Sequence, residues 1–584
     1  MRPENKPDCK SVAKAAVLWQ SVSPAMRRWI FFASPMPELV RAASPRSHVD
    51  FFAVKPQRRR ACVWFVLGML FSVGQGLSQE QAARTSDAAV RVHFAGFDQI
   101  QAATNAPALA EIWKLPETSQ LRTHVLQRLA AGLAKSFRSR TDQAGAAPLA
   151  LLSPLLHEAL QRESYLEVRP LGNQSFAWTL AIQLDPARIS VWQTHCAQLI
   201  AAWHCVTSSG TNHLAFASAN SWFVLQGISG AASDESKRAE ASPVFRQISA
   251  KRRPIDPPKN YFLKADLNLT RLPAELPFFT APNQPAVELT VSGKGSGLKT
   301  EGRLLFPQPV RWQLEKWQIP TRTIRDPDGT LVSFTAAQGI AAWLSRQQVV
   351  RDLEVAPFPN QLFAWSDSHA PFQIMTAARV KNATNVLAKF VTEMMPKLNV
   401  SLDELGVGAL ESQTNRLAVF WRGLAPVLVP YVRLAPEPGQ DFLEAGIFPV
   451  EQTSKNPPPP ELLEQLTSRP NLLYYDWEIT QERLAQLRAV APHVATFLDI
   501  PTLEAGLASS RWFDAIQPKL VNTVTEVTVQ SPRELRLARS SEIGFNGLEL
   551  VALAHWLESA NFPKLNLQLA LRPPARPRKQ AANP

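Results

Sequence analysis

The sequence predicts an α+β fold of two similar lobes, each an antiparallel-rich sheet with helices packed on one face. Alternating apolar segments outnumber those that a parallel sheet would need. Short polar turns join several of these segments into hairpins. Helical segments lie between the hairpins, which is typical of the α+β class. The composition agrees with a folded chain, since 45% of the residues are hydrophobic and 19% are charged.

The first recognisable element is an export signal at residues 58–78. It combines a basic cluster, an uncharged apolar run and small residues at a cleavage site: Arg58, Arg59, Arg60, residues 61–78, Gly76 and Ser78. This order is that of a signal peptide cleaved after Ser78. We therefore expect export to the periplasm or secretion. The alternative is a retained anchor with an exported domain, although 18 uncharged residues are marginal for a membrane span.

The positive charge of the chain is concentrated at its two ends. The net charge is +13, and residues 1–78 contribute 12 basic and 4 acidic residues, or +8. Residues 1–57 form an N-terminal extension, and we expect translation to begin near Val54. Residues 571–584 form a basic tail that we predict to be disordered. A nucleic-acid-binding protein carries its excess charge on one face, so no nucleic-acid partner is expected.

The first lobe is predicted at residues 79–315. Apolar periodicity predicts helices at 107–138, 150–162 and 186–203. Two hairpins are predicted from alternating segments joined by polar turns: His213–Ala217 with Trp222–Gly227, and Val287–Ser292 with Leu298–Leu305.

The second lobe is predicted at residues 316–570, after a boundary near 310–330. Pro320 and the turn 326–329 mark that boundary. Pro457–Pro460 forms a stiff loop within this lobe. Helices are predicted at 335–348, 382–396, 460–468 and 480–498.

Four segments of the first lobe recur in the same order in the second. Val92–Ile100 is similar to Val332–Ile340, Phe176–Leu199 to Phe372–Met395, Asn260–Leu272 to Asn471–Leu484, and Val287–Phe306 to Val524–Phe545. Self-similarity in a constant order indicates repeated structural units. We interpret it as an internal duplication.

Three apolar segments, two of them within these repeats, also carry a family resemblance. The start Phe94–Ile100 leads into Ala108–Pro116, and the segment Asn471–Trp477 follows much later. Together with the signal peptide, they resemble a bacterial family of exported proteins that carry a domain of unknown function. The likeness covers most of residues 88–560. The resemblance implies export and no particular activity.

Two cysteines remain after the signal segment, Cys196 and Cys205. Cys196 falls on the apolar face of the helix predicted at 186–203, so we interpret it as a buried thiol. A disulfide between Cys196 and Cys205 is the alternative, since an exported location permits one.

Motifs for cofactors and metals are incomplete. Gly293–Thr300 resembles a phosphate-binding loop, but Leu298 stands where glycine must precede the lysine. We interpret this segment as a glycine-rich hairpin turn. His157 lacks the second histidine of a zinc-binding helix, because Gln161 occupies that position. The His-Cys pairs at 195–196 and 204–205 are too close in sequence for a zinc site. We therefore expect no cofactor and no bound metal.

Asp476 and Glu478 form a carboxylate pair on a predicted strand. Alternate residues of a strand share a face, so this pair would suit a glycosidase. We favour a solvated polar face instead, with Tyr475 and Trp477 turned toward the core.

These observations favour a non-enzymatic protein of the cell envelope or periplasm that binds a partner protein, a peptide or an apolar ligand. One alternative is an exported hydrolase whose site is assembled from distant residues. Another is a membrane-anchored assembly factor that retains residues 61–78, the chain's one expected contact with a membrane. An apolar cleft with few titratable groups would favour binding, and a cleft that gathers acidic or histidine side chains of shifted pKa would favour the enzyme.

Overall fold

The structure is a computed structural model that describes most of the chain from residue 88 onward. The described residues are 88–136, 147–172, 175–203, 213–229, 243–251, 261–271, 283–320, 330–368, 374–413, 417–424, 429–435, 441–447, 460–498, 506–560 and 562–563. The predicted export signal, Cys205 and the basic tail lie outside these ranges. Within them, no helix has the length and apolar character needed to cross a membrane.

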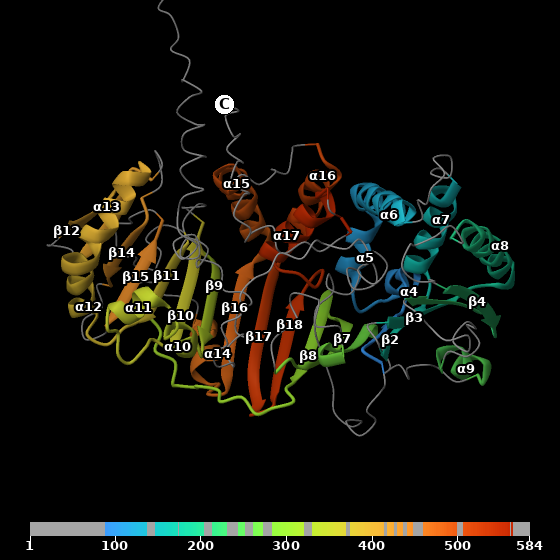
Figure 1. The fold of residues 1–584 in the computed structure, drawn as a ribbon, viewed down its shortest axis with the longest axis horizontal. Helices are drawn as coiled ribbons and strands as arrows, with labels where there is room; N and C mark the ends of the chain where they lie inside the picture. Colours follow the sequence, from blue (N-terminus) through green and yellow to red (C-terminus); the bar gives the residue numbers. More distant parts are fainter. Residues whose placement is uncertain are drawn as a thin grey trace, which may run out of the picture.

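The described strands join into one 18-stranded antiparallel sheet that runs along the molecule's long axis (Figure 1). Residue pairing places the strands in the order β4-β5-β3-β2-β1-β6-β7-β8-β18-β17-β16-β9-β10-β11-β15-β14-β13-β12. A mixed helix-and-strand fold with a large antiparallel sheet is thus confirmed.

The strands of the first half include alternating segments, such as Val287–Val291, and segments that are apolar on both faces, such as Trp222–Leu225. They are β1 (Val90–Phe94), β2 (Ser164–Gly172), β3 (Ser175–Gln183), β4 (His213–Ala219), β5 (Trp222–Ser229), β6 (Tyr261–Asn268), β7 (Ala286–Lys294) and β8 (Gly297–Leu305). Those of the second half are β9 (Leu331–Gln338), β10 (Gln361–Asp367), β11 (Met375–Arg379), β12 (Ala409–Gln413), β13 (Ala418–Arg422), β14 (Tyr431–Leu434), β15 (Phe442–Gly446), β16 (Leu472–Ile479), β17 (Asn522–Ser531) and β18 (Glu534–Ser541).

The helices fall in the segments between these strands and after the last one. They are α4 (Phe97–Ala102), α5 (Pro107–Lys114), α6 (Pro116–Ser136), α7 (Ala147–Gln161), α8 (Pro186–Trp203), α9 (Pro243–Ser249), η5 (Leu269–Arg271), α10 (Ala341–Leu344), α11 (Gln348–Asp352), α12 (Ala383–Lys389), η6 (Phe390–Met394), α13 (Met395–Leu405), α14 (Pro460–Thr467), α15 (Thr480–Leu498), α16 (Ala508–Ile516), η8 (Gln517–Lys519) and α17 (Gly547–Glu558).

The central strands of the two halves of the sheet follow the same connectivity, whereas the outer strands differ. In the first half, β1 lies between β2 and β6, with β3 beyond β2 and the β7–β8 hairpin beyond β6. In the second half, β9 lies between β10 and β16, with β11 beyond β10 and the β17–β18 hairpin beyond β16. Strands β8 and β18 pair and so join the halves edge to edge.

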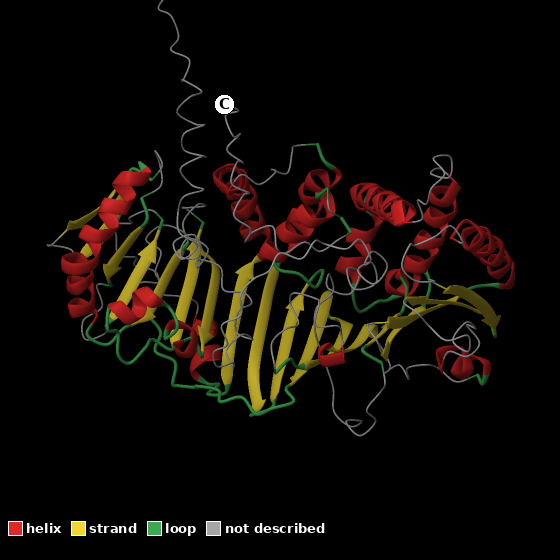
Figure 2. Cartoon of the chain, in the orientation of Figure 1, coloured by secondary structure: helices red, strands yellow, loops and turns green. Residues whose placement is uncertain are grey.

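Most helices lie on one face of the sheet, which we call the helical face (Figure 2). Ile100 of α4 packs there with Val92 of β1. Helices α9 and α14 lie on the opposite face. Leu462 of α14 packs with Phe334 of β9 and Phe363 of β10. Helices thus cover parts of both faces, because several strands carry apolar residues on both sides.

Several expected elements match the structure closely, and one is wrong. The helices expected at 186–203 and 480–498 are α8 and α15, and the glycine-rich segment is the β7–β8 hairpin turn, with Gly295 at φ +66°. The expected helix at 335–348 is wrong over residues 335–338, because Leu331–Gln338 is strand β9, and within the rest of that range the short helix α10 covers Ala341–Leu344. The apolar run of β9 suits either structure, and pairing with strands on both sides selects the strand.

Residues that the repeat alignment pairs do not always lie on the same face of the sheet. Ala265 on β6 and Asp476 on β16, which the alignment pairs, both lie on the helical face. Val92 also lies on that face, whereas its aligned partner Val332 shares the opposite face with Phe334. That alignment is therefore shifted by one residue relative to the sheet.

Candidate functional site

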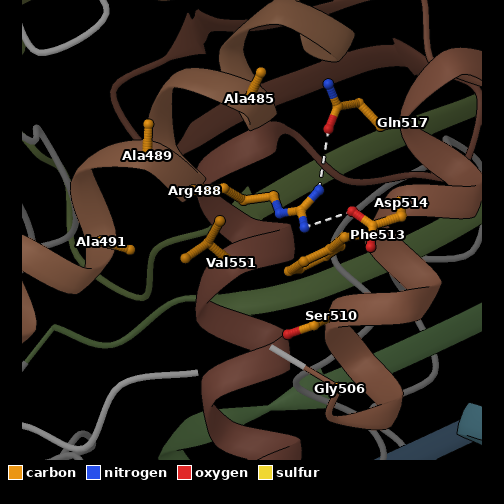
Figure 3. Close-up of a pocket in the computed structure, with 10 residues that line it drawn as sticks. All are labelled: Ala485, Arg488, Ala489, Ala491, Gly506, Ser510, Phe513, Asp514, Gln517 and Val551. Carbon is orange, nitrogen blue, oxygen red and sulfur yellow. Dashed lines mark hydrogen bonds and ion pairs between the residues drawn. The ribbon is translucent and has the colours of Figure 1, made fainter. Parts of the chain in front are cut away.

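A cavity of about 470 Å³ lies between helices α15, α16 and α17 (Figure 3). Small or apolar side chains form much of its wall. Those from α15 are Ala485, Ala489 and Ala491, and Phe513 of α16 and Val551 of α17 face them. A volume of several hundred cubic ångströms with apolar walls is typical of sites for small ligands.

Arg488 extends across this cavity (Figure 3). Its Nη2 donates to Asp514 Oδ1 at 2.7 Å, and its Nη1 donates to Gln517 Oε1 at 3.2 Å. Its guanidinium carbon lies 5.5 Å from the ring centroid of Phe513. The Asp514 side chain is 67% exposed and that of Arg488 is 29% exposed. The Asp514 carboxylate is the more exposed partner of this ion pair. An anionic group of a ligand can therefore take its place beside the Arg488 guanidinium, which stays largely buried.

The helices around the cavity are held against helices of the first half. Phe513 packs in a core cluster with Ile112 of α5. Trp512 Nε1 donates to Thr118 Oγ1 of α6 at 3.0 Å. The buried carboxylate of Glu558 on α17 accepts the backbone N–H of Ser509 at 3.2 Å. Burial opposes ionisation of this carboxyl, but its hydrogen bonds outweigh that effect and lower its pKa.

A buried polar cluster lies beneath α15 and α17, between these helices and the sheet. Asp476 and Glu478 of β16 are 7% and 3% exposed. The expectation of a solvated face for this pair is wrong, because helices cover the face that the sequence pattern marks as polar. Tyr475 is also buried, on the opposite side of the strand.

The two carboxylates bind the N-terminus of α17. Gly547 donates its backbone N–H to Glu478 Oε1 at 2.7 Å. Asn546 caps the helix in a capping box with Glu549, and its Nδ2 donates to Asp476 Oδ2 at 3.4 Å. A carboxylate at a helix N-terminus is favourable, since the helix dipole is positive there.

Two guanidinium groups face these carboxylates. Arg539 of β18, with a side chain 11% exposed, donates to both oxygens of Glu549 at 2.7 and 2.8 Å. Arg483 of α15 donates to Ser366 Oγ at 3.2 Å and acts electrostatically on Glu478. The cluster thus holds three carboxyl groups, counting Glu549, and two guanidinium groups.

The pKa values of the carboxyl pair reflect this surplus of acid. Burial, followed by the charge of Asp476, raises the pKa of Glu478 to about 7. Burial also raises the pKa of Asp476, against hydrogen bonds from Thr335 and Asn546. A pKa of about 7 leaves the Glu478 carboxyl partly protonated near neutral pH.

The corresponding place in the first half is apolar. Leu263, Ala265 and Leu267 of β6 lie under α4 and α5, in a core cluster with Val92 and Ile100. The same strand order therefore folds around an apolar layer in one half and around buried charges in the other. The first half shows that an apolar layer is sufficient for this strand order. The buried charges of the second half are therefore not needed for the fold, and they are a candidate for function.

A second cavity, of about 270 Å³, lies at the ends of β1, β2 and β3 and is lined by Glu163. His93 Nε2 lies 2.9 Å from Glu163 Oε1, and His93 Nδ1 bonds the Tyr261 hydroxyl. Among the described residues, Glu163 lines this cavity while His93 and Tyr261 stand behind it. The imidazole is thus shielded from anything that enters.

Those residues predicted from the sequence that the structure describes line neither cavity. Arg58, Arg59, Arg60, Gly76 and Ser78 lie outside the described residues. Cys196 is 1% exposed in the core of α8, and burial raises its pKa to about 12. Cys205 lies outside the described residues, so the disulfide stays a prediction.

Sequence reasoning missed Arg488, Arg483 and Arg539. Each is a single arginine among ordinary helix or strand residues, and no spacing links them. The one available signal was the alternation of Asp476 and Glu478 within an apolar strand.

Comparison with known proteins adds little. No family model matches the chain. No curated protein matches it. One solved structure, described as crystal form I of TP0453, is 7% identical and covers 41% of this chain and 100% of that chain, with a TM-score of 0.18. A TM-score this low carries no argument about fold or function.

Proposed function

We propose that this chain is an exported, non-enzymatic protein of the cell envelope that binds an apolar ligand or peptide carrying an anionic group. The observation that carries the proposal is the cavity between α15, α16 and α17. Much of its wall is apolar, and Arg488 supplies a cation held in place by Asp514, Gln517 and the ring of Phe513. Such a wall with one fixed polar group binds apolar molecules and orients their charged end.

Binding is favoured over catalysis at this cavity by the identity of its charged groups. Among the described residues that line it, Arg488 and Asp514 carry charge. Asp476 and Glu478, whose pKa values are raised, lie on the inner side of the helices instead. No acid–base pair therefore faces the space that a ligand would occupy.

Replacing Arg488 by glutamine tests this function. We expect the affinity for the anionic apolar dye anilinonaphthalene sulfonate to fall about tenfold or more, because a charge-assisted hydrogen bond is lost. Fluorescence titration of the purified protein measures it. Arg511→Gln is the matched control, since Arg511 is an exposed arginine on α16 outside the cavity lining. Equal affinity of both variants would show that the dye does not use this cavity.

Export is part of the same proposal and is supported by the basic cluster and apolar run at residues 58–78. We expect a mature protein that starts at Gln79 in the exported fraction. Cell fractionation followed by mass spectrometry of the N-terminus measures this. A product that retains residues 61–78 in the membrane would instead support an anchored assembly factor.

We also propose that the two halves arose by duplication and form two similar lobes. The shared strand connectivity and the four repeated segments support this proposal. The polar cluster and the cavity would then be features acquired by the second half alone.

A further inference from the structure

We propose that the polar cluster beneath α17 is a proton-operated latch that sets the ligand affinity of the cavity, an inference that rests on the proposed binding function. The cluster and the cavity share one helix. Glu478 and Asp476 hold the first residues of α17, and Val551, one turn further along, forms part of the cavity wall. A change at the helix N-terminus therefore moves or loosens that wall.

The charge count of the cluster requires a proton. Three carboxyl groups, Asp476, Glu478 and Glu549, share two guanidinium groups, those of Arg483 and Arg539. With every group ionised, the cluster carries one uncompensated negative charge in a largely buried place. Such a charge is costly unless it is neutralised or reaches water.

Charged and titratable groups lie on several of the elements around Glu478. Its own strand contributes Tyr474 and Asp476, and α15 contributes Arg483. Strand β18 contributes Arg539, and α17 contributes Glu549. The cross-strand neighbours of Glu478, Ser333 on β9 and Thr523 on β17, are uncharged.

The direction of the effect follows from this environment. With a proton bound, the cluster is neutral and α17 stays docked, with the Gly547 N–H bonded to Glu478. Once the proton leaves, the cluster carries an uncompensated negative charge, which water would stabilise. Water can reach this charge only if α17 moves away from β16. Arg483 and the Gly547 N–H favour the ionised Glu478 carboxyl, but burial and the Asp476 charge outweigh them and raise its pKa. The cavity is therefore complete at low pH and weakened at high pH.

The raised pKa of Glu478 makes the stability of the folded protein depend on pH. A carboxyl whose pKa is raised from 4.5 when unfolded to about 7 when folded binds more protons in the folded state. Stability is then lost as pH rises between these two values. The folding equilibrium constant should fall on the order of a hundredfold across this window through Glu478 alone.

The decisive variant is Glu478→Gln, which keeps an oxygen for the Gly547 N–H and cannot ionise. We expect the dye affinity of the natural protein to fall about tenfold between about pH 5 and about pH 8. The Glu478→Gln variant should keep the low-pH affinity at both values, and urea unfolding should lose its slope with pH. Glu461→Gln, at an exposed carboxylate on α14, should retain the natural profile.

The outcomes separate the latch from the binding function. The latch is refuted if Glu478→Gln keeps the natural pH dependence, or if the natural protein shows none. The binding function fails by a different result, namely when Arg488→Gln leaves dye affinity unchanged at both pH values. Urea unfolding at each pH confirms that every variant compared is folded.

Discussion

Replacing Arg539 by methionine is expected to lower the free energy of unfolding by about 3–5 kcal/mol. The Arg539 side chain is 11% exposed and holds both oxygens of Glu549, the Thr525 hydroxyl and the Gly544 carbonyl. Methionine fills a similar volume but leaves Glu549 without its cation and Asp476 with Arg483 alone. The loss therefore reports uncompensated charge and not a missing volume. Urea denaturation at neutral pH measures it.

Arg536→Met on the same strand is the matched control. Arg536 lies on the opposite face, 48% exposed, and pairs with Glu301 at 3.2 Å. An exposed ion pair of this kind contributes about 0–1 kcal/mol. Adding Glu549→Gln to Arg539→Met should recover part of the loss, since glutamine also completes a capping box. Equal losses for Arg539→Met and Arg536→Met would contradict the cluster's electrostatic role.

Replacing Phe513 by alanine is expected to cost about 3–5 kcal/mol of unfolding free energy. Phe513 is 1% exposed and packs with Ile112 of the first half and with Ile516 and Leu550 of the second. Its removal leaves a void at the contact between the halves. The same change removes the ring beneath Arg488, so dye affinity should fall as well. Denaturation and dye titration of one preparation measure both effects.

Phe513→Leu separates the two effects of this substitution. Leucine restores most of the buried volume, so the stability loss should shrink to about 1–2 kcal/mol. It does not restore the face of the aromatic ring, which attracts a guanidinium. The dye affinity should therefore remain reduced. Recovery of full affinity in Phe513→Leu would show that Arg488 does not depend on the ring.

The sequence predicted individual elements better than their assembly. Helices α8 and α15 and the β7–β8 hairpin follow from apolar periodicity and turn residues, which act over a few neighbours. The run at 331–338 misled the prediction, because an apolar segment of this length suits a helix or a strand even with the expected turn at 326–329 before it and Gly339 after it. Only its partners β10 and β16 decide the matter.

The cavity was beyond prediction for a similar reason. Its wall residues come from α15 and α16 and from α17, which strands β17 and β18 separate from the other two helices along the chain. An alanine on α15 does not indicate whether another helix packs close to it. Only the packing of these helices turns Arg488 from an ordinary helix residue into the cation of an apolar space.

The sequence by itself determined the α+β class, the order of most elements and the repeated order of segments, because each depends on local periodicity or on self-similarity. Tertiary structure alone decided that the halves join into one sheet and that Asp476 and Glu478 are buried. Alternation along a strand shows that two carboxylates share a face. Whether that face meets water or a helix depends on elements more than sixty residues away, such as α17 and its capping Asn546.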